Sequence, residues 1–205
     1  MVFAMSLGLG IVGLEEVLEL EFTEIIEPEE AQRRVAAQLP PGLEVLSARR
    51  IPTKVTAQVS RAGYRVAVPA ERMAELPNQI DAVLAATECW VERTKPTRRR
   101  LNLRPFVSEL RVTDQHLEML LWVTPNGAAR PGEILGLVGL GDLVESGVLI
   151  ERHVLEIHDE IQQPGPTLPA QEPSRQPALP DGPPDSADKP ARPTALISGP
   201  MSYDS

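Results

Sequence analysis

The chain has 205 residues, a net charge of −9 and one cysteine. This length corresponds to one ordinary domain or two small ones. A single cysteine excludes an internal disulfide, a cysteine-only zinc site and a self-contained iron–sulfur cluster. Aromatic residues make up 3% of the chain, so we expect an aliphatic core. No run approaches about 18 uninterrupted apolar residues, so the sequence predicts no membrane-spanning helix.

The first part of the chain predicts a β–α–β unit. The apolar residues 1–13 predict a strand, and residues 16–23 alternate apolar and charged side chains, as in a strand with one wet face. Pro28, followed by two glutamates, is typical of a helix N-terminus, where the helix dipole favours acidic side chains. A Pro-Pro-Gly run ends that helix, and residues 43–51 predict the next strand.

A second segment with a similar order of predicted elements follows the first β–α–β unit. Residues 54–60 predict a short linker or helical turn, and residues 63–68 predict a strand. Residues 70–85 have apolar side chains at helical spacing, in a helix that Pro77 is expected to kink or split. Residues 87–94 predict another strand. The two segments show no clear sequence repeat.

The third part of the chain predicts an antiparallel hairpin. Residues 101–112 and 116–124 read as two strands joined by a short turn, and Pro105 indicates an edge strand or a bulge. Residues 131–138 predict a short helix, and residues 148–157 the last strand. Interleaved helices and strands with an antiparallel pair favour an α+β fold, specifically a ferredoxin-like α/β sandwich with mixed or antiparallel sheets.

The C-terminal segment differs from the rest in composition. Eleven of the 21 prolines lie between Pro164 and Pro200. Such a segment cannot bury enough apolar surface to offset the cost of ordering the chain. We therefore expect a folded domain over residues 1–161 and a disordered proline-rich tail over residues 162–205. Two P-x-x-P matches leave open a docking arm or an unconstrained extension.

Charge is unevenly distributed. Residues 1–48 carry a net charge of −7, residues 49–111 carry +7, residues 112–163 carry −7 and the remainder carries −2. An arginine-rich segment attracts phosphate backbones, so the basic middle is a candidate surface for nucleic acid. The alternative is that these arginines pair with the acidic flanking segments in the folded chain.

No motif in the sequence identifies an independent enzyme. Gly8, Gly10 and Gly13 spell G-x-G-x-x-G, but a strand-like run follows them instead of the helix that a nucleotide site needs. His153 and His158 are five residues apart, which places them on opposite faces of one strand. The sequence therefore predicts no catalytic residue, no metal site and no cofactor.

Several segments together resemble a known family. They are the run FAMSLGLGIVGLEEVLELEF from Phe3, LPPGL at Leu39–Leu43, Ala62-Gly63-Tyr64, Asn102-Leu103-Arg104-Pro105-Phe106, and Gly127 followed by Arg130-Pro131 and Glu133-Ile134-Leu135. This pattern, over residues 2–160, resembles a bacterial domain of unknown function linked to radical SAM proteins. The resemblance implies a domain fused behind a B12-binding radical SAM enzyme or encoded beside one.

Two departures from that family are visible. Family members begin with a further strand and helix that hold a Ser-His-Leu-Asp motif, so the resemblance implies that this chain lacks its N-terminal strand and helix. Asn102 stands where the family has Asp. The chain also lacks the Cys-x3-Cys-x2-Cys that ligates the radical cluster, so it cannot be the radical enzyme itself.

These observations lead to one main hypothesis. The chain would be a non-catalytic accessory module of a cytoplasmic radical SAM protein. The module would contact tRNA or rRNA through its basic middle. The expected contact residues are Arg93, Lys95, Arg98, Arg99, Arg100, Arg104 and Arg130. Two alternatives stay open: a small enzyme that uses Arg104 and Arg130 on an anionic substrate, and a truncated fragment without function.

Overall fold

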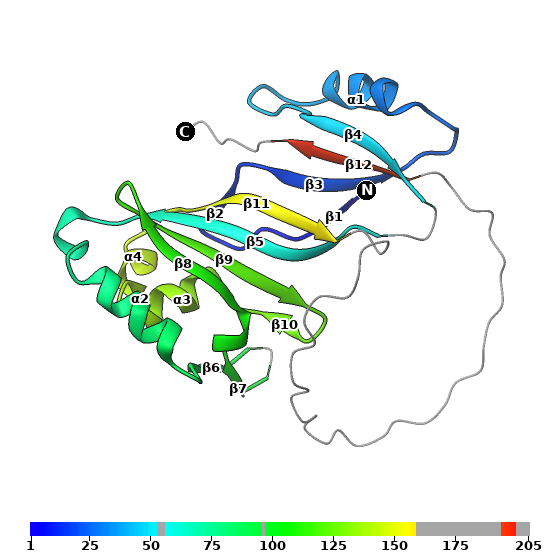
Figure 1. Cartoon of the computed structure of the whole chain (residues 1–205). Coiled ribbons are helices and arrows are strands. Elements are labelled where there is room, and N and C mark those ends of the chain that lie inside the picture. The colour runs from blue at the N-terminus through cyan, green and yellow to red at the C-terminus, as the bar shows by residue number, and fades with distance from the viewer. Residues whose placement is uncertain (53–55, 96, 159–193, 200–205) are drawn as a thin grey trace, which may run out of the picture.

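The computed structural model describes residues 1–52, 56–95, 97–158 and 194–199 (Figure 1). These residues form two larger β-sheets and one two-stranded sheet. Helix α1 lies at one end of the molecule, the other helices lie at the opposite end, and the sheets lie between them. The helices are α1 (Pro28–Ala36), α2 (Leu76–Ala85), α3 (Pro131–Leu137) and α4 (Gly141–Glu145), with short 3-10 turns η1 (Ala70–Arg72) and η2 (Arg104–Phe106).

The larger sheet is six-stranded, curled and mixed. Strand β9 contacts β5 on one side and both β8 and β10 on the other, and β11 and β2 follow beyond β5. All pairs are antiparallel except the parallel pair of β2 with β11. The strands are β2 (Ile11–Gly13), β5 (Gln58–Ala67), β8 (Val107–Thr113), β9 (His116–Thr124), β10 (Gly127–Ala128) and β11 (Ile150–His158). The predicted α+β class is confirmed.

One face of this sheet forms the main core. Alternate residues of β5 and β9, such as Tyr64 and Met119, are buried with apolar residues of α2 and α3, such as Ile80 and Leu135. The side-chain period of two in a strand places these residues on one face, and the charged residues between them on the other. Full burial of a side chain such as Ile80, Met119 or Leu135 contributes about 1.5–3 kcal/mol, so burial of this face is the main driving force for folding.

The smaller sheet has the strand order β1-β3-β12-β4. Its strands are β1 (Val2–Phe3), β3 (Glu16–Glu21), β4 (Ser47–Ile51) and β12 (Thr194–Gly199). Strand β12 is antiparallel to both β3 and β4, so β3 and β4 run parallel to each other with α1 as their crossover. Helix α1 begins at a proline and buries Ala31, as the predicted β–α–β unit requires.

Two of the predicted boundaries were wrong for local reasons. The expected strand over 101–112 is instead β7 (Arg99–Asn102), η2 and β8, because Pro105 lies in the 3-10 turn and cannot donate to a sheet ladder. The expected linker over 54–60 already contains the start of β5. The expected helix over 70–85 is divided into η1 and α2, as Pro77 indicated. The hairpin turn at Asp114 and Gln115 is confirmed, with both residues at positive φ.

Of the predicted proline-rich tail over 162–205, the described residues include one segment. Thr194–Gly199 form β12, because the run Thr-Ala-Leu-Ile-Ser has the β propensity that the surrounding prolines lack. Residues 159–193 and 200–205 lie outside the described residues. Most of the predicted tail, including both P-x-x-P matches, falls in these two ranges.

A buried ion pair joins the two sheets. The Arg152 guanidinium in β11 donates from Nε to Glu16 of β3 at 2.9 Å and from a terminal nitrogen to the other Glu16 oxygen at 2.5 Å. Two more bonds reach the carbonyl oxygens of Met5 at 2.8 Å and Ser6 at 3.2 Å. Both charged side chains are 1% exposed. Glu16 and Arg152 therefore hold the N-terminal segment, β3 and β11 together.

Gly13 leaves the room that this ion pair needs. A Cβ atom built on Gly13 would lie 2.3 Å from Glu16 Oε1 and 2.7 Å from Glu16 Cγ. We therefore expect Gly13→Ala to displace the carboxylate and lower the melting temperature by several degrees, as loss of about 1 kcal/mol or more does in a domain of this size. Thermal unfolding followed by circular dichroism measures the shift. Gly136→Ala is the matched control, since outside its own helix backbone the space at its Cβ position is open, and an equal shift in both variants would contradict the prediction.

Candidate nucleic-acid interface

The basic middle of the sequence folds in part into a small exposed hairpin. Strands β6 (Trp90–Arg93) and β7 pair antiparallel, with Trp90 opposite Asn102 and Glu92 opposite Arg100. Alternation along each strand turns Val91 and Leu101 toward the core, and leaves the opposite face of the hairpin to solvent.

Four of the seven predicted contact residues lie exposed on or beside this hairpin. Lys95, Arg98, Arg99 and Arg100 are all exposed. The Arg98 side chain is 79% exposed and pairs with Glu92. The Arg100 guanidinium lies over the Trp90 ring, 5.1 Å from its centroid, and Trp90 itself is 47% exposed. The hairpin and its turn thus expose four cations and one aromatic ring, which together we name the Trp90 surface (Trp90, Lys95, Arg98, Arg99 and Arg100). Arg99 is exposed but pairs with Arg93, so it lies on the other face of the strand pair from Trp90 and Arg100.

Arg93 has a different place in the structure, because its position on β6 turns it inward. Its side chain is 7% exposed and makes two bonds with the Glu133 carboxylate, at 2.6 and 2.7 Å, and one with the Ala128 carbonyl oxygen at 2.8 Å. Burial raises the pKa of Glu133, but bonds from Arg93 and from the Arg130 backbone N–H outweigh it, so the net pKa lies below the ordinary value. Arg93 therefore holds the hairpin against α3.

Arg104 also bonds within the protein. Its guanidinium donates to the Leu84 carbonyl oxygen at 3.0 and 3.2 Å, near the end of α2, and to the Val107 carbonyl oxygen at 3.2 Å. A cation that bonds the last carbonyl groups of a helix satisfies acceptors that have no partner in the helix. Asn102 has a similar local part, since its Oδ1 accepts from the backbone N–H groups of Cys89 at 2.8 Å and Arg104 at 3.1 Å.

Arg130 lies at the start of α3 and is exposed. Its backbone N–H donates to Glu133 at 2.9 Å, on the same carboxylate that Arg93 contacts. The structure therefore brings Arg93 and Arg130 to one carboxylate, while Arg104 lies at the end of α2.

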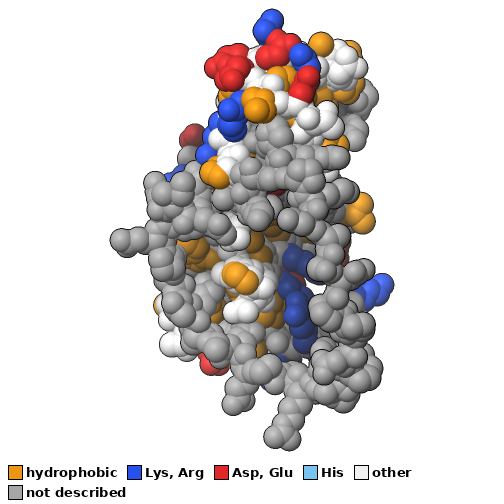
Figure 2. Space-filling view, turned by 90° about the vertical axis from the view of Figure 1, so that its right-hand side faces the viewer, with side chains coloured by type: hydrophobic (Ala, Val, Ile, Leu, Met, Phe, Trp, Pro, Cys, Tyr) orange, Lys and Arg blue, Asp and Glu red, His pale blue; other side chains and the backbone are white. Residues whose placement is uncertain are grey.

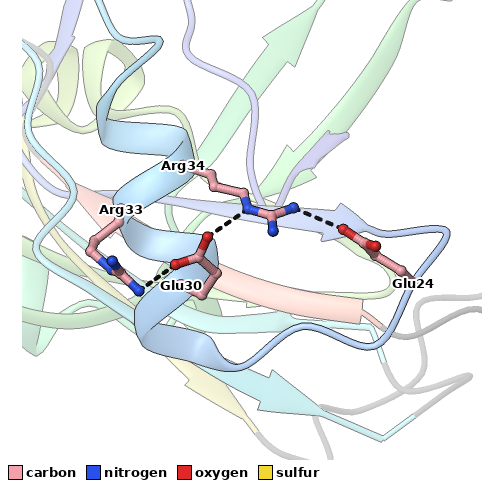
Figure 3. A network of polar contacts seen from close by, with 4 residues as sticks. All are labelled: Glu24, Glu30, Arg33 and Arg34. Atoms are coloured by element: carbon pink, nitrogen blue, oxygen red, sulfur yellow. Dashed lines mark hydrogen bonds and ion pairs between the residues drawn. The ribbon is translucent and has the colours of Figure 1, made fainter.

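A second cluster of exposed arginines lies at the other end of the molecule, on α1 (Figure 3). Arg34 bonds Glu30 at 2.7 Å and Glu24 at 2.8 Å, and Arg33 pairs with Glu30. The bond from Arg34 is the largest cause that lowers the pKa of Glu30. In Figure 2, acidic and basic side chains mix at this upper end, whereas basic side chains gather in the lower half beside hydrophobic ones. At α1, therefore, arginines pair with acidic side chains, as the alternative interpretation of the charge distribution expected.

A small pocket lies on the open face of the six-stranded sheet. It has a volume of about 180 Å³, below the roughly 300–1,000 Å³ of small-molecule sites. Burial lowers the pKa of His153 in its wall. Ion pairs Arg61–Glu156 and Arg111–Glu118, both at 2.6 Å, hold charges around it. Arg104 and Arg130 are not among its lining residues, which are Gly63, Glu109, Arg111, Glu118, Met119, Leu120, His153, Val154 and Glu156.

Among the described residues, no group of three or more His, Cys, Asp or Glu side chains is placed to hold a metal ion. No helix in this part of the chain is long and apolar enough to cross a membrane. The sequence reasoning missed the stacking of Arg100 on Trp90. Trp90 lies in the predicted strand 87–94 and Arg100 directly before the predicted strand 101–112, and this proximity was the available signal, but the register that brings them together was not predicted.

Comparisons with known proteins give one match. No curated protein matches the chain, and no solved structure matches it. Residues 1–131 match the model of a family described as "Uncharacterized protein conserved in bacteria (DUF2344)". This match covers more than half of the 205 residues. The chain therefore belongs to the DUF2344 family of bacterial proteins.

Proposed function

We propose that this chain is a non-catalytic binding module that presents the Trp90 surface to RNA. The observation that carries the proposal is the exposed Arg100 guanidinium over an exposed Trp90 ring, with Lys95, Arg98 and Arg99 on the same hairpin. Aromatic faces that stack unpaired bases, beside cations that contact phosphates, are the common means of binding single-stranded RNA. The segment 49–111, which contains this hairpin, carries +7 although the whole chain carries −9.

The geometry supports fewer RNA-contact residues than the seven that were expected from the sequence. Arg93 and Arg104 bond to protein acceptors, so we assign them to positioning the hairpin and α2. Arg130, which is exposed and starts the helix that holds Glu133, would extend the surface. The partner implied by the resemblance is a cytoplasmic radical SAM protein, to which the module would bring its tRNA or rRNA.

We further infer a ferredoxin-like unit as the scaffold of this surface. The elements β5, α2, β8, β9, α3 and β11 follow the β–α–β–β–α–β order of that motif. Their strand order β8-β9-β5-β11, antiparallel throughout, supports the same inference. The hairpin β6–β7 is then an insertion between the first helix and the second strand of the unit.

Binding of fluorescently labelled tRNA, followed by anisotropy at about 50 and 200 mM salt, tests the proposal. We expect Arg99→Ala/Arg100→Ala to weaken binding and to reduce the slope of log K against log salt by about 1.4–1.8, since two phosphate contacts are lost. We expect Trp90→Ala to weaken binding by about tenfold through lost stacking, with little change of slope.

The matched control is Arg33→Ala/Arg34→Ala on α1. This variant also removes two positive charges, but from an exposed surface at the opposite end of the molecule. We expect the salt slope of this variant to equal that of the wild type. An equal loss in both double variants, or no binding of the wild type at about 50 mM salt, would contradict the proposal.

A further inference from the structure

The two larger sheets share one arrangement of four strands. In the larger sheet the order is β8-β9-β5-β11, and in the smaller sheet it is β1-β3-β12-β4. Each begins with an antiparallel strand pair, although β8 and β9 form a hairpin and the chain between β1 and β3 also forms β2. In each the third strand is antiparallel to both neighbours. The connection from the second strand to the fourth is helical in both sheets: α1 in the smaller sheet, and α3 and α4 after β10 in the larger sheet. Strand β12 thus occupies in one sheet the position that β5 occupies in the other.

The connectivity of these two strands differs. Strand β5 is followed directly by η1 and α2, so it is part of a continuous unit. Strand β12 comes from the C-terminal segment, far in sequence from β3 and β4, the strands that it separates. The other strands of the smaller sheet, β1, β3 and β4, all lie within the first 51 residues of the chain.

The position of β12 is a slot between two strand edges. Six residue pairs join β12 to β3 and five join it to β4, so its main chain is paired on both sides. Without β12, parallel strands β3 and β4 would present unpaired N–H and C=O groups to each other. Such edges are templates for an added strand, with main-chain bonds as the source of affinity.

We infer that the slot between β3 and β4 is a binding site for an extended peptide, and that Thr194–Gly199 is its displaceable occupant from the same chain. The occupant in trans would be an uncharged six-residue segment with an aliphatic centre. It would run antiparallel to both strands, as Thr194–Gly199 does, with its centre opposite Leu18 and Ala48. A tethered strand has an effective concentration on the order of millimolar, so it outcompetes a free peptide until it is released.

The test uses the full chain with β12 disabled in place. Ile197→Pro removes a backbone donor that a central strand needs. A labelled peptide of residues 192–201 with the wild-type sequence is then added. We expect the variant chain to bind it at least about tenfold more tightly than the wild-type chain, whose slot is occupied. A peptide that carries the same proline is the control and should not bind either chain.

A cross-link provides the second measurement. Ser198 is directly opposite Ser47 in the register of β12 and β4, and the single native cysteine, Cys89, is buried. We expect Ser47→Cys/Ser198→Cys to form an intramolecular disulfide, and Ser47→Cys/Ala195→Cys, which is out of register, to form none. Equal peptide binding by wild-type and Ile197→Pro chains would overturn the inference, as would a folded variant that does not bind. Equal cross-linking of both cysteine pairs, or a disulfide between two copies, would also overturn it.

Discussion

We expect Arg152→Met to lower the free energy of unfolding by about 3–5 kcal/mol, because it leaves a buried carboxylate without its cation. Arg152 and Glu16 are each 1% exposed, and four hydrogen bonds satisfy the guanidinium. Burial lowers the pKa of Arg152, but the bonds and charge of Glu16 outweigh it and raise the pKa, so the guanidinium stays charged. Urea denaturation at pH 7 measures the loss.

Two further variants distinguish the buried pair from an ordinary surface pair. The double variant Arg152→Met/Glu16→Gln should recover part of the loss, because no unpaired charge then remains buried. Arg111→Met removes an ion pair with Glu118 on the exposed sheet face, where the arginine side chain is 65% exposed. We expect no measurable change there. The prediction is wrong if Arg152→Met and Arg111→Met unfold at the same urea concentration.

The second prediction concerns Arg93, which the sequence had assigned to RNA. We expect Arg93→Met to destabilise the fold by about 2–3 kcal/mol, because the Glu133 carboxylate and the Ala128 carbonyl oxygen lose a charged donor. Any effect on RNA binding should then follow from loss of the hairpin's position. Lys95→Met, which changes an exposed side chain beside the same hairpin, is the control and should leave stability unchanged.

The ion pair between Arg93 and Glu133 also makes the free energy of unfolding depend on pH. The pKa of Glu133 in the fold lies below its ordinary value of 4.5. As pH falls through that ordinary value, the unfolded chain binds this proton first, so the free energy of unfolding decreases until the folded pKa is passed. In Glu133→Gln this part of the decrease should be absent, although stability at pH 7 is lower. Urea denaturation at pH 7, 5, 4 and 3 measures the difference between the two proteins. An identical pH dependence would contradict the assignment.

Much of the fold was predictable from local patterns. Residues 16–23 mainly alternate apolar and charged side chains, and residues 116–124 form a largely apolar run before a turn signal; both are strands, β3 and β9. Pro28 and Pro131 start helices, because the proline N–H is not needed in a first turn. These signals act over a few neighbouring residues, so periodicity and turn chemistry are sufficient to detect them. Boundaries failed at Pro105, where a proline interrupts a run that is otherwise typical of a strand.

The candidate site was predictable only in its location. The charge distribution identified the basic segment, and the exposed Lys95, Arg98, Arg99 and Arg100 lie within it. The sequence cannot distinguish Arg93, which bonds Glu133 across 40 residues, from its exposed neighbours. Which face of β6 lies against α3 decides this difference, and that contact forms only when distant elements pack.

The sequence by itself determined the α+β class, the single thiol, the basic middle and the positions of most strands, because these depend on composition and on short-range periodicity. The tertiary structure alone decided three features: the buried Arg152–Glu16 pair, the stack of Arg100 on Trp90, and the strand Thr194–Gly199 between β3 and β4. Each depends on register between segments far apart along the chain. Register is set by long-range packing of whole faces, and no local pattern of residues encodes it.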